Sequence, residues 1–278
     1  MLFYEGEAYA SASAPQRRQG SILINMLDLS GDELVLDVGC GPGLVALNLL
    51  RKYPRIRLHG IDISPEMIKV ANRFKHDLAQ DRLSFEVIDL FDYEPENPYD
   101  LTFSSSAMHW AIPADIAYEK LHRFTKPAGV LAVHQGGKGT YGGYHEAALE
   151  VAEYFDLSAL FEGWSYPTYY PTDTELEALL SETGFTEIRI TSQKQMLEED
   201  DFSAEAFAYS GLLPYLDRVP DNQRGLFRQE FMRHAVRTVQ SVFHHRLYVI
   251  AKAGEPPSPR PDRSAANRNL PADVTGPR

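Results

Sequence analysis

The sequence predicts an α/β protein built on a doubly wound, mostly parallel sheet. Short apolar segments alternate with helical ones over residues 34–135, which is the pattern of repeated strand–helix units. A glycine-rich turn joins the first strand to its helix, and acidic or polar residues follow the next strands. Because parallel strands present their carboxyl ends at one edge of a sheet, we expect these residues to surround a ligand site there.

The first strand and its turn occupy residues 34–43, with the sequence LVLDVGCGPG. Glycines at positions 39, 41 and 43 precede an apolar helix. A turn without β-carbons ahead of a helix N-terminus lets a nucleotide-type ligand lie against free backbone N–H groups. A dinucleotide-binding turn needs its third glycine at position 44, where this chain has Leu44, and Pro42 lies within the turn. An NAD-dependent dehydrogenase is therefore an alternative that the spacing disfavours.

The second predicted strand, residues 56–62, ends in Asp62. A carboxylate at this position accepts hydrogen bonds from both hydroxyls of a ribose. Ser64 already supplies a cap for the next helix, residues 65–79, which favours the binding role of Asp62 over a capping role. Met67 in that helix either covers an adenine ring or packs in the core.

The remaining strands of this half are predicted at residues 83–88, 100–105 and 130–134, with a helix at 114–124 and a turn at 126–129. Asp89 follows the third strand and is either a ligand-binding acid or part of a solvated turn. The fourth strand ends in a polar run that leads into His109 and Trp110.

The glycine turn, the two acids and the polar end of the fourth strand together resemble the motifs of class I S-adenosylmethionine (SAM)-dependent methyltransferases. The resemblance covers residues 1–135 and implies a Rossmann-like, seven-stranded sheet completed by a helix and two strands, at 172–185, 186–195 and 245–253. It implies SAM as cofactor and S-adenosylhomocysteine as product, with Asp37 near the methionine end and Asp89 at the adenine amino group. The implied cofactor-binding residues are Asp37, Gly39, Cys40, Gly41, Gly43, Asp62, Ile63, Met67, Asp89, Leu90, Ser104 and Ser105.

A closer similarity links residues 104–110 and 126–129 to the trans-aconitate and juvenile-hormone-acid methyltransferases, which methylate carboxylates. Residues 210–217, 224–227 and 245–251 are also similar to the C-terminal part of the trans-aconitate group. In the juvenile-hormone-acid group, a glutamine of the N-terminal helix and the tryptophan after the fourth strand hold the substrate carboxylate. Gln16 and Trp110 stand at these positions, so the resemblance implies methyl transfer to a carboxylate oxygen of a small, partly apolar molecule.

The choice of acceptor decides whether a base is needed. A carboxylate is ionised at pH 7, so orientation for in-line displacement is the main catalytic contribution. A hydroxyl, nitrogen or carbon acceptor of a natural product, as in secondary metabolism, would use His109 as general base. His109 as a structural residue and a SAM-binding module without methyl transfer are the further alternatives.

Two aromatic-rich insertions, residues 136–171 and about 202–243, leave from the carboxyl edge of the sheet, and the second is expected to be helical. We expect them to form a lid over an apolar or aromatic substrate, larger than a small tricarboxylate requires. The candidate substrate-binding residues are Tyr9, Arg18, Gln135, Tyr141, Trp164 and Tyr209.

Composition narrows the class of protein. The chain has 278 residues and a net charge of -12, so we expect neither nucleic acid nor an anionic membrane as partner. The single cysteine, Cys40, and the lack of a signal peptide or apolar span predict a cytoplasmic protein. No cysteine, histidine or acidic cluster has metal-ligand spacing. We expect one methyltransferase domain over residues 1–253 and a disordered proline-rich tail at 254–278; the sequence leaves the oligomeric state unknown.

Overall fold

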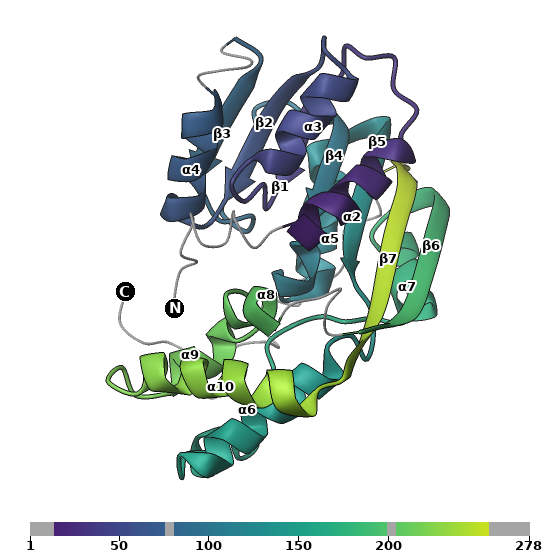
Figure 1. Cartoon of the computed structure of the whole chain (residues 1–278). Helices are drawn as coiled ribbons and strands as arrows, with labels where there is room; N and C mark the ends of the chain where they lie inside the picture. Colours follow the sequence, from purple (N-terminus) through teal and green to yellow (C-terminus); the bar gives the residue numbers. More distant parts are fainter. Residues whose placement is uncertain (1–13, 76–80, 199–203, 256–278) are drawn as a thin grey trace.

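The computed structural model describes residues 14–75, 81–198 and 204–255. Its centre is a seven-stranded sheet with the strand order β3-β2-β1-β4-β5-β7-β6 (Figure 1). The five strands from β3 to β5 are parallel, and β7 is antiparallel to both β5 and β6. The strands are β1 (Leu34–Val38), β2 (Arg57–Asp62), β3 (Leu83–Val87), β4 (Tyr99–Ser105), β5 (Thr125–Gly136), β6 (Phe185–Glu198) and β7 (Ser241–Ala253). The predicted doubly wound, mostly parallel sheet is confirmed.

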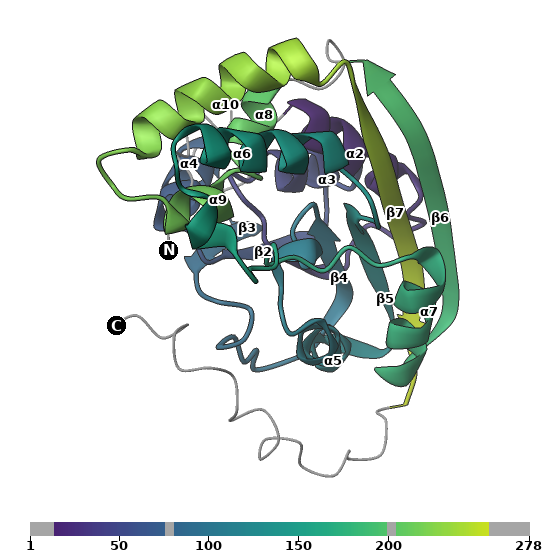
Figure 2. The same ribbon diagram turned by 90° about the horizontal axis from the view of Figure 1, so that it is seen from below.

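Helices cover both faces of this sheet (Figure 2). One face carries α2 (Ala14–Asn25), α3 (Leu44–Lys52) and α4 (Pro65–Lys75). The other face carries α5 (Ala114–Phe124) and α7 (Asp173–Glu182). Each face buries its own apolar core, so the sheet is a shared middle layer.

Local sequence explains where α7 begins and ends. Thr172 caps its N-terminus, and its hydroxyl accepts a hydrogen bond from the backbone N–H of Glu175. The carboxylate of Glu175 accepts one from the backbone N–H of Thr172, which completes a reciprocal capping box. Gly184, with a φ of 97°, ends the helical segment as expected, because glycine adopts this conformation without strain.

The largest differences from the predicted boundaries concern β5 and β7. Residues 126–129, predicted as a turn before the fifth strand, form a bulge inside β5, because β5 advances from Thr125 to Val130 while β4 advances only from Tyr99 to Leu101. Residues 241–243, assigned to the helical insertion, belong to β7. They pair with the last residues of β6, whose backbone hydrogen bonds lengthen both strands.

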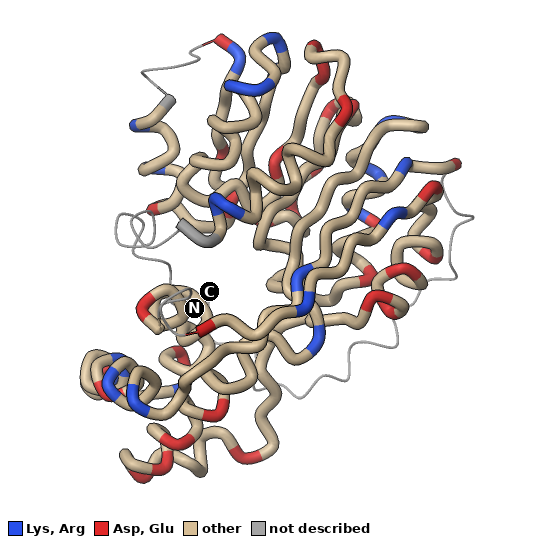
Figure 3. The backbone as a smooth tube through the Cα atoms, turned by 45° about the vertical axis from the view of Figure 1, so that its right-hand side comes forward, with Lys and Arg blue, Asp and Glu red and all other residues tan. Residues whose placement is uncertain are grey.

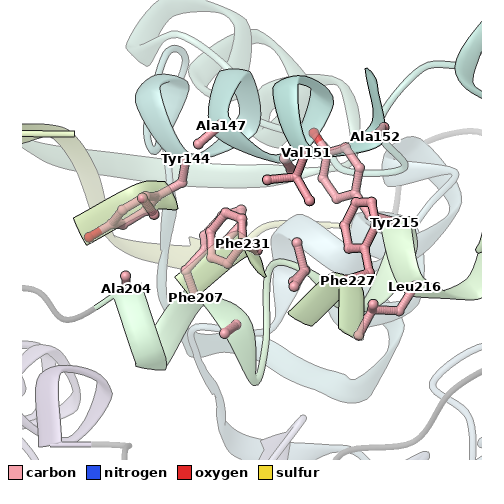
Figure 4. Close-up of a cluster of buried hydrophobic side chains, with 14 of the residues drawn as sticks. Tyr144, Ala147, Val151, Ala152, Ala204, Phe207, Tyr215, Leu216, Phe227 and Phe231 are labelled. Carbon is pink, nitrogen blue, oxygen red and sulfur yellow. The ribbon is translucent and has the colours of Figure 1, made fainter. Parts of the chain in front are cut away.

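The two insertions fold together as one helical body beyond the carboxyl ends of the parallel strands (Figure 1). The elements of this body are α6 (Gly142–Tyr154), η2 (Ser158–Phe161), α8 (Ala204–Ala208), α9 (Leu213–Arg218) and α10 (Arg224–Thr238). Its buried side chains meet between α6 and α10 (Figure 4). Phe207, Phe231 and Tyr144 are at most 1% exposed, so most of the aromatic enrichment of the insertions forms a core.

Strand β7 connects this body to the sheet. Val242 packs in the core of the helical body, Leu247 in the core under α5, and Tyr248 in the core under α2. One strand therefore contributes to all three cores of the described chain.

Lysine and arginine are interspersed with aspartate and glutamate along the described part of the chain (Figure 3). Within these residues, no helix has the length and apolar character needed to cross a membrane. The same residues contain no group of three or more histidine, cysteine, aspartate or glutamate side chains that could hold a metal ion.

We expect Phe231→Ala to lower the free energy of unfolding by about 3–5 kcal/mol, because it removes a fully buried ring from the helical body. Denaturant titration measures this change. The matched control is Leu226→Ala in the same helix, whose side chain is 55% exposed and whose effect should stay within about 0.5 kcal/mol. Equal effects of the two substitutions would show that the helical body is not a packed core.

Candidate active site

The glycine turn after β1 is fixed by two hydrogen bonds to β2. The backbone N–H groups of Gly39 and Cys40 both donate to the carbonyl oxygen of Ile61, at 2.8 and 3.0 Å. Gly39 and Gly41 have φ values of 69° and 54°, which non-glycine residues rarely adopt. A β-carbon at Gly39 would lie 2.2 Å from the β-carbon of Ala107, whereas one at Gly41 would meet nothing within 4 Å. The turn is therefore closed against the β4 loop at Gly39 and open at Gly41, where a ligand can approach its backbone.

Asp62 organises the end of β2 beside this turn. Its carboxylate accepts hydrogen bonds from the backbone N–H groups of Gly41 and Ser64, both at 2.9 Å. Burial raises the pKa of Asp62 above its usual value, although these two hydrogen bonds oppose the shift. Two oxygens hold about four lone pairs, so the carboxylate retains acceptor capacity for ligand hydroxyls.

Asp37 lies at the carboxyl end of β1 and is 2% exposed. Its Oδ2 atom is buried without a hydrogen-bond partner among the described residues. Burial, and then the negative charge of Asp62, raise the pKa of Asp37 to about 8. Two neighbouring carboxyl groups that resist being charged together fit a cationic ligand, because a positive charge would stabilise both ionised forms.

The other predicted cofactor residues differ in their surroundings. Asp89 is half-buried and accepts a hydrogen bond from the backbone N–H of Phe91 at 2.9 Å, as in a tight turn. Ser104 is fully buried and donates to the carbonyl oxygen of Val38 at 2.8 Å, so its hydroxyl ties β4 to β1. Ser105 has a buried hydroxyl without a partner among the described residues.

The four remaining residues predicted to bind the cofactor differ in how deeply they are buried. Met67 is 2% exposed, which agrees with the core-packing alternative, whereas Ile63 is 42% exposed directly after Asp62. Leu90 packs against the core under α5. Cys40 is buried, and burial raises the pKa of its thiol.

His109 and Trp110 lie in a short 3-10 helix, η1 (Met108–Trp110), directly after β4. The imidazole of His109 is 8% exposed and stacks on Tyr170, with ring centroids 5.4 Å apart. Its Nδ1 atom has no partner among the described residues. Burial, together with the positive charge of Arg246, lowers the pKa of His109 to about 3. The ring is therefore neutral at physiological pH and a poor proton acceptor.

Helix α2 carries the predicted acceptor-binding residue Gln16. The Oε1 atom of Gln16 is buried without a partner among the described residues. One turn further along α2, Gln19 accepts a hydrogen bond from the hydroxyl of Tyr248. The ring of Tyr248 stacks on His134, with centroids 4.8 Å apart. These contacts fix the N-terminal part of α2 against β5 and β7.

The predicted substrate-binding residues fall into separate places. Tyr141 hydrogen-bonds to Arg246 of β7. Gln135 accepts a hydrogen bond from the hydroxyl of Tyr118 at 2.7 Å, and its Nε2 atom is buried without a partner among the described residues. Trp164 packs against Tyr215 inside the helical body, with ring centroids 5.0 Å apart.

Two further members of that set make contacts elsewhere, and a third lies outside the described residues. The ring of Tyr209 lies under the guanidinium of Arg228, 5.1 Å from its carbon. Arg18 lines an open pocket between α2 and α3, together with Arg17 and Arg51. Tyr9 lies outside the described residues.

Arg246 was not predicted as a site residue. The signal available was the alternation in β7, which places His244, Arg246 and Tyr248 on one face of the strand. A buried arginine in the middle of a strand is uncommon.

The comparisons with known proteins agree with this geometry. Residues 35–129 match the profile of a methyltransferase domain. Malonyl-acyl-carrier-protein O-methyltransferase 2 of Ilyobacter polytropus is 30% identical over 128 residues, which are 46% of this chain and 48% of that protein. Trans-aconitate 2-methyltransferase of an Azoarcus species is 24% identical over 233 residues, which are 80% of this chain and 85% of that protein. The chain spans about half the length of the first curated relatives that it matches.

A solved structure shows the same fold. Phosphoethanolamine N-methyltransferase 2 of Haemonchus contortus, in complex with S-adenosyl-L-methionine, aligns with a TM-score of 0.59 at 18% identity, over 89% of this chain and 56% of that one. The matched domain, the strand order and the glycine turn with its acids together identify the fold. Residues 35–129 of this chain match a methyltransferase domain, and its sheet has the fold of the solved methyltransferase.

Proposed function

We propose that this protein transfers the methyl group of SAM to a carboxylate oxygen of a small, partly apolar molecule. The observation that carries the proposal is a set of buried polar atoms without partners among the described residues. Asp37 supplies one near the carboxyl end of β1, His109 supplies one directly after β4, and Gln16 supplies one in the first turns of α2. Buried polar groups are normally hydrogen-bonded, so this pattern is expected where ligands bind.

The residues beside the glycine turn fit SAM. SAM carries a methyl group on a positively charged sulfur and supplies it as an electrophile. Asp62 would accept the ribose hydroxyls, and Asp89 would serve the adenine amino group. The open face of Gly41 allows the ligand to lie against backbone, and the carboxyl of Asp37 would stabilise positive charge at the methionine end.

His109, Trp110 and Gln16 fit a carboxylate acceptor better than an acceptor that must first lose a proton. His109 is held neutral with a pKa of about 3, which is too low for an effective general base near pH 7. The indole N–H of Trp110 and the amide of Gln16 would instead hold one carboxylate oxygen and leave the other to attack. The two relatives described above are named for malonyl and aconitate substrates, and both of these carry carboxylates.

The helical body supports an acceptor with an apolar or aromatic part. The ring of Tyr166 lies 6.0 Å from that of Trp110 and 4.3 Å from that of His145, between the sheet edge and the helical body. We propose that the two insertions act as a lid at this edge, that the substrate is a free small molecule rather than a macromolecule, and that the protein works in the cytoplasm. The single buried cysteine is consistent with a reducing compartment.

We expect Asp62→Asn to weaken the binding of SAM and of S-adenosylhomocysteine by about 10- to 100-fold, because hydrogen bonds to a charged acceptor are lost. Isothermal titration calorimetry measures the change. Asp92→Asn, at an exposed position 30 residues further along, is the control and should bind like the wild type. Unchanged affinity of Asp62→Asn would remove the assignment of the ribose site.

We expect the affinity for SAM to depend on pH through Asp37. The carboxyl has a pKa of about 8, so it is mostly protonated at pH 7, whereas a cationic ligand favours the ionised form. Affinity should therefore rise by up to about tenfold per pH unit below pH 8 and level off above it, with proton release on binding. Calorimetry in buffers of different ionisation enthalpy measures both effects. Asp37→Asn should bind more weakly and without this pH dependence; a wild-type affinity that is flat from pH 6 to 9 would contradict the assignment.

We expect Trp110→Phe to lower kcat by about 10- to 100-fold with unchanged affinity for S-adenosylhomocysteine, because the phenyl ring cannot donate a hydrogen bond to the acceptor. His109→Asn should retain most of the activity. Ester formation from labelled SAM on a panel of small carboxylic acids measures both. A general base contributes about 10²- to 10⁴-fold, so a loss of that size in His109→Asn would favour base-catalysed transfer to another acceptor.

A further inference from the structure

Arg246 is a buried cation without an acidic partner in the described chain. It lies on β7 opposite Gly136 of β5 and is 7% exposed. Among residues 14–75, 81–198 and 204–255, no aspartate or glutamate lies within ion-pair distance of its guanidinium. Arginine retains its charge in proteins, so this positive charge is not removed by deprotonation.

The partners that Arg246 does have are neutral. Its Nη2 atom donates to the hydroxyl of Tyr141 and lies 3.3 Å from Nδ1 of His244. The guanidinium carbon lies 4.9 Å from the centre of the Tyr141 ring. Its Nε atom is buried without a partner among the described residues. Neutral groups and a ring face offset only part of the cost of burying a charge, so the described residues leave this cation without full compensation.

This cation faces the side of the site where the acceptor would bind. A β-carbon at Gly136, opposite Arg246, would lie 2.7 Å from the ring of Tyr170, so glycine allows that ring to cover the strand. Tyr170 in turn stacks on His109, the neighbour of Trp110. The charge of Arg246 also lowers the pKa of both His109 and His134, as expected for a cation close to both rings.

We infer that Arg246 binds the carboxylate of the methyl acceptor and supplies its counter-ion. The inference rests on the proposed function and specifies its substrate class as acids whose anionic form is bound. A carboxylate accepts strong, charge-assisted hydrogen bonds from a guanidinium, and the free Nε–H can donate one. Methylation turns the anionic carboxylate into a neutral ester, so the charge that Arg246 compensates is present in the acceptor and absent from the product. Arg246 therefore favours binding of the acid and release of the ester.

The test compares the wild type with Arg246→Gln, Arg246→Lys and the control Arg189→Gln. Arg189 is an exposed residue of β6 in the same sheet. Each protein is saturated with S-adenosylhomocysteine and titrated calorimetrically with trans-aconitate, octanoate and 4-phenylbutanoate, and with the amide of the last acid. For the acids that bind the wild type, we expect Arg246→Gln to lose at least about 30-fold in affinity. Arg246→Lys should lose less, and the control should be unchanged. The amide should bind the wild type and Arg246→Gln equally.

Two further measurements distinguish a binding role of Arg246 from a purely structural role. Affinity for S-adenosylhomocysteine should be the same in all four proteins, which also shows that each variant is folded. The thermal midpoint of ligand-free Arg246→Gln should equal or exceed that of the wild type, because the substitution removes an uncompensated buried charge. A lower midpoint together with unchanged acid affinity would mean that Arg246 is structural.

The outcomes also separate the inference from the proposed function. Equal acid affinity in the wild type and Arg246→Gln, or failure of every acid to bind the wild type, overturns the inference. Formation of methyl esters from labelled SAM in the same proteins tests the function. Acid binding that depends on Arg246 without any ester formation supports the inference and contradicts the proposed function.

Discussion

The pairing of β7 between β5 and β6 is the constraint on which the rest of the structure depends. This strand closes the parallel sheet, and its side chains enter the two cores of the sheet and the core of the helical body. Because side chains alternate along a strand, a register slip of one residue would move Tyr248 and Arg246 to the opposite face of the sheet. The position of the helical body and the polarity of the site edge are therefore fixed by the same set of backbone hydrogen bonds.

Buried ionisable side chains, which are rare in a stable core, lie at that edge. Asp37 is buried beside a second carboxyl, and Arg246 is buried without an acid in the described chain. Asp37 becomes anionic when a cation binds, whereas Arg246 keeps its positive charge, so the two groups suit ligands of opposite sign. Each lowers the stability of the ligand-free fold and gives a ligand of opposite charge a reason to bind. A sulfonium cofactor and a carboxylate acceptor together match this arrangement, and methyl transfer between them neutralises both.

Much of the fold could be predicted from sequence because its signals are local. The alternation of strands and helices, the glycine turn and the acid at Asp62 are each readable within a few residues. The bulge at 126–129 was missed because it depends on the register between β4 and β5. Arg246 was missed because its lack of an acidic partner is a property of the packed interior. The role of Trp164 in substrate binding stays a prediction: it is partly buried and packs against the core of the helical body, and aromatic content alone does not distinguish a core from a pocket.

The contact at Gly39 has a consequence for how such an enzyme can diversify. A single additional carbon there would collide with Ala107, two residues before His109. The cofactor turn and the loop that carries His109 and Trp110 are thus in direct contact. A larger side chain in the turn would require a change in the loop as well. The helical body is joined to the sheet edge through side-chain packing and two long strands, which leaves its inner surface freer to vary. New acceptor specificities are then more accessible through substitutions in the helical body than through substitutions at the cofactor turn.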